Sequence, residues 1–100
     1  MPLSDLERSV CDAIADGRDE LVKLAATLIA FDTTARKVGD PAREEAALQE
    51  HLAARLRAAG ADIDLFEPDA GQLAGAPLVP EGLDFAGRPQ LIATLRGAGG

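Results

Sequence analysis

The fold of this chain is decided by residues 40–67, which read DPAREEAALQEHLAARLRAAGADIDLFE. Asp40-Pro41 is a pair that begins helices, because the Asp side chain accepts hydrogen bonds from free backbone N–H groups and proline suits the first helical position. Gly60 supplies the left-handed residue on which helices commonly end. We therefore predict a helix over about 41–59. Its apolar face is formed by residues at helical spacing, namely Leu48, Leu52, Leu56 and Ala59.

A strand is expected directly after this helix, over about 61–67. The alternation of residue types places Ile63 and Leu65 on one face of the strand and Asp62 and Asp64 on the other. A helix, a glycine stop and a strand in this order form a building block of α/β folds.

The N-terminal region predicts a second long helix, over about 4–30. Ser4 and Glu7 have the spacing of a capping box. Gly17 lowers helix stability by about 1 kcal/mol relative to alanine, but the apolar stripe keeps its phase across Gly17, and we therefore expect one helix. The spacing also resembles that of a coiled coil, but fewer than four full heptads make a weak case for one. The members of the stripe are Leu6, Val10, Ile14, Leu21, Leu24, Leu28 and Phe31.

Two stretches of loop and one further strand complete the pattern. Residues 31–39 are expected to form a turn, and residues 68–89 a long irregular loop, because glycine and proline are frequent in residues 68–89. Residues 90–96, QLIATLR, predict a strand whose nearly continuous apolar character suits cover on both faces.

Two helices and two strands make a marginal sheet, since typical sheets have more strands. Residues 97–100, GAGG, resemble a connection to a further strand. We interpret the chain as the N-terminal part of a larger α/β domain that is incomplete on its own.

Composition restricts the class of protein. One hundred residues is the size of one small domain, and the net charge of −7 disfavours nucleic acid and anionic membranes as partners. The single Cys11 excludes an internal disulfide and fits a reducing compartment. With no apolar run of membrane-spanning length and no signal-like N-terminus, a cytoplasmic location is expected.

Residues capable of chemistry are few. His51 is the single histidine, and a helical zinc site needs more ligands than it can offer, so His51 is expected to be a solvated or partly packed residue of the second helix. Cys11 has no activating partner in the sequence and is expected to be a buried, inert thiol. Ser4 and the threonines at 33 and 34 are explained by capping and turn formation.

Two further clusters are also better explained by structure than by function. The carboxylates Asp62, Asp64, Glu67 and Asp69 lack the spacing of a calcium loop and suit a solvated strand face. Residues 97–100 lack the continuation that a phosphate-binding loop requires. No catalytic, cofactor-binding or metal-ligating residue is therefore predicted in this chain.

Three segments resemble one family of enzymes. Residues 28–34, LIAFDTT, look like the end of the first helix and the following turn in zinc-dependent amidohydrolases related to acetylornithine deacetylase and succinyl-diaminopimelate desuccinylase. Gly39, Glu44, Glu45 and the leucine-rich stretch 48–60 are similar to the acidic residues and helix that follow that turn.

The most specific of the three segments is residues 85–100, FAGRPQLIATLRGAGG, which resembles the family's Gly-Arg-Pro-Asn strand and Gly-rich turn. Gln90 stands where asparagine is common, and residues 35–38, ARKV, replace a proline-rich turn of many members.

The resemblance implies a zinc-peptidase-like, three-layer α/β/α catalytic domain of which this chain is the N-terminal part. The whole enzyme would use two zinc ions and a glutamate base to hydrolyse an amide of a small N-acylated amino acid or peptide. The ligand positions of the family come after Gly100, so this segment is expected to bind no zinc and to be inactive alone. The alternative is a small non-enzymatic α/β interaction module that forms a homodimer through its first helix.

Overall fold

The computed structural model describes residues 2–35, 37 and 39–98 and is a mixed α/β structure with one two-stranded antiparallel sheet. It divides into two compact units, an N-terminal unit of residues 1–30 and a C-terminal unit of residues 31–100. Part of the turn predicted at 31–39 and part of the Gly-rich end at 97–100 lie outside the described residues, at Arg36, Val38, Gly99 and Gly100.

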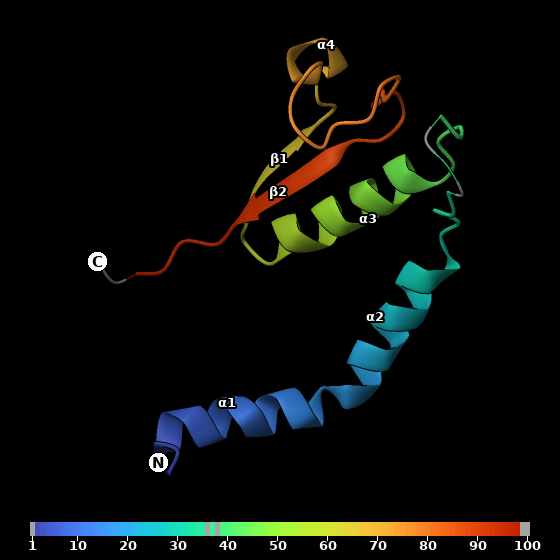
Figure 1. Ribbon diagram of the computed structural model, residues 1–100. Helices are drawn as coiled ribbons and strands as arrows, with labels where there is room; N and C mark the ends of the chain where they lie inside the picture. The colour runs from blue at the N-terminus through green and yellow to red at the C-terminus, as the bar shows by residue number, and fades with distance from the viewer. Residues whose placement is uncertain (1, 36, 38, 99–100) are drawn as a thin grey trace. The chain divides into compact units, whose positions relative to one another are not determined.

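Helix α1, Asp5–Asp16, begins with the predicted capping box (Figure 1). The Glu7 backbone N–H donates to Ser4 Oγ at 3.2 Å, and the Ser4 backbone N–H donates to the Glu7 carboxylate at 2.7 Å. These hydrogen bonds also lower the pKa of Glu7 below its ordinary value, that from the Ser4 backbone most of all.

The prediction of one helix over 4–30 is wrong, because the helix breaks at Gly17. The Gly17 N–H donates to the carbonyls of Ala13 and Ile14, and helix α2 starts afresh at Arg18–Ala30. The apolar stripe of α1 is exposed, with Leu6 75% exposed, so no packing compensates for the conformational freedom of glycine at this point.

Replacing Ser4 by alanine is expected to destabilise α1 by about 1 kcal/mol, because the N–H of Glu7 loses its acceptor. Circular dichroism should show reduced helix content, and NMR should place the loss in α1. The control is Ser9→Ala, within the same helix, where alanine is the better helix former. Equal helix content in the two variants would contradict the capping role.

Helix α3, Glu45–Ala58, ends as predicted at Gly60. Gly60 has φ +94°, its N–H donates to the Arg57 carbonyl at 3.0 Å, and the Ala61 N–H donates to the Leu56 carbonyl at 3.0 Å. This pair of hydrogen bonds is a Schellman motif, which satisfies the last carbonyls of the helix.

The predicted start of α3 at Asp40-Pro41 is wrong by several residues. The Asp40 carbonyl accepts a hydrogen bond from Arg88, and the Glu44 N–H donates to the Asp32 carbonyl at 3.0 Å. These contacts with distant parts of the chain hold residues 40–44 in an irregular path, so the helix begins only at Glu45.

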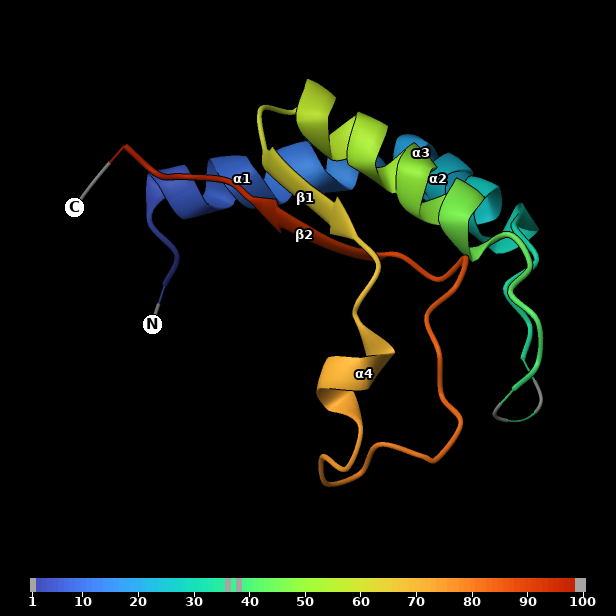
Figure 2. The ribbon, with the colours of Figure 1, turned by 90° about the horizontal axis from the view of Figure 1, so that it is seen from above.

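Strands β1, Asp62–Phe66, and β2, Gln90–Thr94, pair antiparallel, with Leu65 opposite Leu91 and Asp64 opposite Ile92. Helix α3 lies along one face of this pair (Figures 1 and 2). Ile63 and Leu65 are half-buried while Asp62 and Asp64 are exposed, so the predicted two faces of β1 are confirmed.

Leu48, Leu52 and Leu56 are half-buried, as their spacing predicts, but Ala59 is exposed and does not extend the stripe. The most buried side chain among the described residues is Ala53, at 1% exposure. On the outward face of the sheet Ile92 is 53% exposed, so this chain's own elements do not supply the two-sided cover that the composition of β2 predicts.

The connection between the strands, residues 67–89, is irregular as predicted apart from one short helix, α4, Ala70–Leu73. Asp69 caps α4 by accepting a hydrogen bond from the Gly71 N–H at 2.8 Å. The connection extends away from the sheet in Figure 2. No helix within the described ranges has both the length and the apolar character that crossing a membrane requires.

Candidate functional site

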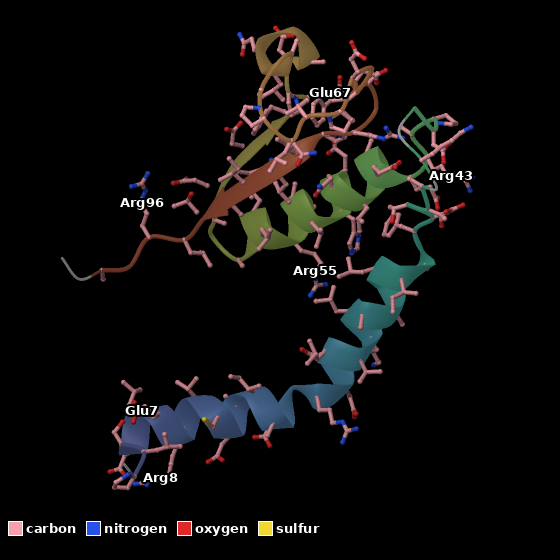
Figure 3. All side chains as sticks on the ribbon, viewed as in Figure 1. Glu7, Arg8, Arg43, Arg55, Glu67 and Arg96 are labelled. Carbon is pink, nitrogen blue, oxygen red and sulfur yellow. The ribbon has the colours of Figure 1, made fainter. Side chains whose placement is uncertain are left out.

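The densest group of interacting polar side chains in the C-terminal unit gathers before α3. Asp32 Oδ2 forms an ion pair with Arg43 Nη1 at 2.9 Å, and Asp32 Oδ1 accepts from the Thr34 N–H at 3.1 Å. Asp32 and Glu44 are joined by two hydrogen bonds: the Glu44 N–H donates to the Asp32 carbonyl, and the Asp32 N–H donates to the Glu44 carboxylate. The turn at 31–34 is therefore fixed to the start of α3, near the Arg43 labelled in Figure 3.

Arg88 connects the start of α3 to the segment that leads into β2. Its Nη2 donates to the Asp40 carbonyl, and its Nε lies 3.7 Å from Glu45 Oε1. The side chains of Arg88 and Glu45 are only 21% and 20% exposed. Gly87, which precedes Arg88 in the sequence, has φ +72°, and a Cβ built on Gly87 would lie 3.0 Å from the Ala42 Cβ. The Gly-Arg-Pro segment, residues 87–89, therefore joins the start of α3 to β2. We call the contacts of Gly87 and Arg88 with residues 40–45 the clasp.

Two carboxylates of this cluster, those of Asp32 and Glu45, have lowered pKa values. The Thr34 backbone N–H, and then the Arg43 guanidinium, lower the pKa of Asp32 below its ordinary value. The N–H groups of Glu45 itself and of Arg43, with a smaller effect of Arg88, lower the pKa of Glu45. Ionised carboxylates engaged by donors are weak general bases, so the arrangement favours a structural role over proton transfer.

The stability of the C-terminal unit is expected to fall in acid. Because the folded pKa values of Asp32 and Glu45 lie below the ordinary 3.8 and 4.5, their contribution is present above those values and is lost as the pH falls through the lower folded values. Glu45→Gln should be less stable at neutral pH and show a smaller loss in acid, in urea titrations at several pH values. Glu50→Gln, exposed on α3, is the control, and an unchanged acid profile in Glu45→Gln would contradict the clasp.

His51 lies on α3, partly buried, with its ring centroid 5.7 Å from that of Phe31. Its Nε2 is buried and has no hydrogen-bond partner among the described residues. The histidine predicted to be solvated or partly packed is therefore a packed one, which anchors the turn at 31–34 to the helix.

The acidic residues around β1 are engaged separately. Asp62 pairs with Arg96 at 3.4 Å beyond the end of β2, Glu67 accepts from the Gly87 N–H at 2.9 Å, and Asp69 caps α4. Arg96 and Glu67 lie at opposite ends of the sheet in Figure 3. Across the described residues, no three His, Cys, Asp or Glu side chains are placed to hold a metal ion together.

The expectation that Cys11 is buried is wrong, because Cys11 is exposed. The reason is the same as for the stripe of α1: the helix has no buried residue. Asp32 forms the turn that its position before the two threonines predicts, with Thr34 as its backbone donor.

The cluster before α3 was not predicted from the sequence. Asp32 and Arg43 are 11 positions apart, and Asp40 and Arg88 are 48 apart. The one local feature of the sequence related to it is Gly87, because glycine tolerates a positive φ and a close approach of the backbone to other atoms.

Comparison of the chain with protein-family models, with curated proteins and with solved structures finds no match.

Proposed function

We propose that this chain is the N-terminal part of the catalytic domain of a zinc-dependent amidohydrolase that cleaves amides of N-acylated amino acids or small peptides. The proposal rests on the resemblance of residues 28–34 and 85–100 to that family. The structural observation that supports it best is the state of β2, the strand that follows the Gly-Arg-Pro segment. Ile92 on its outward face and Leu95 after it are 53% and 64% exposed. Apolar side chains of a strand normally pack against a further layer.

The small size of the buried core also supports the proposal that this chain is part of a larger domain. Ala53 and Ala61 are the two buried apolar residues among those described, and neither fills much volume. A stable unit needs larger buried side chains, since burying a leucine contributes about 1.5–3 kcal/mol. The zinc ligands and the glutamate base would come from later positions of the polypeptide, so no catalytic step is assigned to any residue here.

The proposal predicts the behaviour of residues 1–100 expressed alone. The monomer should be only marginally stable, with a free energy of unfolding in urea below about 5 kcal/mol, because the sheet lacks neighbours at its edges. It should release no acetate from N-acetyl amino acids, with zinc or without. A free energy of unfolding of the monomer above about 5 kcal/mol, or zinc-dependent amide hydrolysis by these residues, would overturn the proposal.

A second candidate is favoured by one observation on α1. Its apolar stripe is exposed at Leu6, Val10 and Ile14, with no residue of the helix buried. An amphipathic helix of this kind suits a non-enzymatic interaction module that dimerises through α1. Sedimentation should then show a dimer that Val10→Asp converts to monomer, while Asp12→Asn, an exposed position, leaves it intact. A monomer at all concentrations would exclude this candidate.

A further inference from the structure

The connection between β1 and β2 has a path that is defined by hydrogen bonds, although most of it is irregular. Its two ends are joined by the hydrogen bond from the Gly87 N–H to Glu67 Oε1, at 2.9 Å. Within it, backbone hydrogen bonds close successive turns, from Ala76 to Leu73 at 3.0 Å and from Val79 to Ala76 at 3.3 Å. Loops longer than about 12–15 residues are uncommon in compact domains, and the ordered ones are usually functional.

This connection encloses a hollow of about 260 Å³. The volume is below that of sites for whole drug-sized ligands or cofactors, which take about 300–1,000 Å³, and suits a single side chain. The walls are mainly apolar and come from both halves of the connection: Ala70, Ala74, Val79, Pro80 and Leu83, with Glu81 as the one ionisable residue.

Leu78 stands next to the hollow in sequence, directly before Val79. Its side chain is fully exposed, and its φ of +66° is the one positive value at a non-glycine position in the described part of the chain. A single exposed leucine is ordinary, but a leucine held in the left-handed region is not, and such strain concentrates at sites of function.

The charged side chains of the connection are all negative. Residues 67–87 contain four carboxylates and no Lys, Arg or His. Three of the carboxylates accept backbone N–H groups, namely Glu67, Asp69 and Asp84. Glu81, which lines the hollow, makes no hydrogen bond or ion pair within the described structure and stays available to a cation.

We propose that the hollow, Leu78 and Glu81 bind a peptide segment of a partner protein in which an aliphatic side chain lies beside an arginine or lysine. The aliphatic side chain enters the hollow, and its neighbour's charge pairs with Glu81. Leu78 adds apolar contact at the edge. A second copy of this chain is a poor occupant, since it carries a net charge of −7 itself. This inference does not rest on the amidohydrolase proposal.

The test is an NMR titration of the nitrogen-15-labelled chain with a short capped peptide containing Leu-Arg between Gly and Ser residues. Amide shifts should be confined to residues 70–83. Peptides with Leu-Glu or Ala-Arg in its place should bind at least about fivefold more weakly. Added salt should weaken the two peptides that carry arginine and should not weaken the Leu-Glu peptide. Equal binding of the three peptides, or no binding, would overturn the proposal.

Substitutions in the chain show whether a loss of peptide binding comes from the hollow itself or from unfolding of the chain. Glu81→Gln should weaken the Leu-Arg peptide about two- to fivefold, whereas Glu50→Gln on α3 should not. Ala74→Leu should fill the hollow and abolish the shifts. Leu78→Asn should weaken binding while leaving the chain at least as stable, because asparagine tolerates the left-handed region. Shifts at 70–83 on simple concentration of the chain would identify a second copy as the occupant and also overturn the proposal.

Discussion

Replacing Ala53 by aspartate is expected to unfold the C-terminal unit. Ala53 is 1% exposed, which makes it the most buried side chain in the described part of the chain, and it belongs to α3, which packs on β1 and β2. Burying an unpaired charge costs about 3–5 kcal/mol, which is as much as a small unit with few buried side chains has in total. The dispersed amide signals of β1 and β2 should disappear from the NMR spectrum.

The control for this substitution is the next residue. Ala54 is exposed on the same helix, so Ala54→Asp changes the charge and helix propensity equally but buries nothing. Its cost should be about 0.5–1 kcal/mol. The comparison is best made with an osmolyte present, which raises the folded population of a marginal unit. Equal urea midpoints for the two variants would show that α3 does not pack on β1 and β2 as described.

Gly87→Ala should have the second largest effect. At φ +72° an alanine is strained by about 1–2 kcal/mol, and its Cβ would also lie 3.0 Å from that of Ala42. The neighbouring Arg88 would be displaced from Asp40 and Glu45. We expect a total loss of about 2–3 kcal/mol in urea unfolding.

Gly82→Ala separates the backbone strain at positive φ from the close contact of the new Cβ with Ala42. Gly82 has φ +79° but no atom within 4 Å of a Cβ built there, so this variant should lose only the strain energy, about 1–2 kcal/mol. Adding Ala42→Gly to Gly87→Ala should recover the difference, and the double-mutant cycle isolates the contact. Equal losses at Gly82 and Gly87, with no recovery, would contradict the close approach of Gly87 to the start of α3.

The features predicted correctly from the sequence are those set by near neighbours. The capping box of Ser4 and Glu7, the stop at Gly60 and the two faces of β1 each depend on residues within a few positions, where steric and hydrogen-bonding rules decide. The strands were located within one or two residues for the same reason.

The features that were missed depend on distant contacts or on their absence. Helix α3 begins late because Asp32 and Arg88 bind the residues before it, and no local pattern encodes a partner 48 positions away. Helix α1 ends before Gly17, and Cys11 is exposed, because no residue of α1 is buried. The hollow beside Leu78 likewise arises from the path of a loop, which glycine and proline content predicts only as irregular.

The central claim is that residues 1–100 belong to a larger metal-dependent catalytic domain. It is tested most directly by sequencing the transcript through the codons that follow Gly100. We expect an open reading frame that continues into an apolar strand ending in a His-x-Asp sequence, which would supply the first metal ligands. A stop codon directly after Gly100, or a continuation without histidine and acidic residues at the end of a strand, would contradict it.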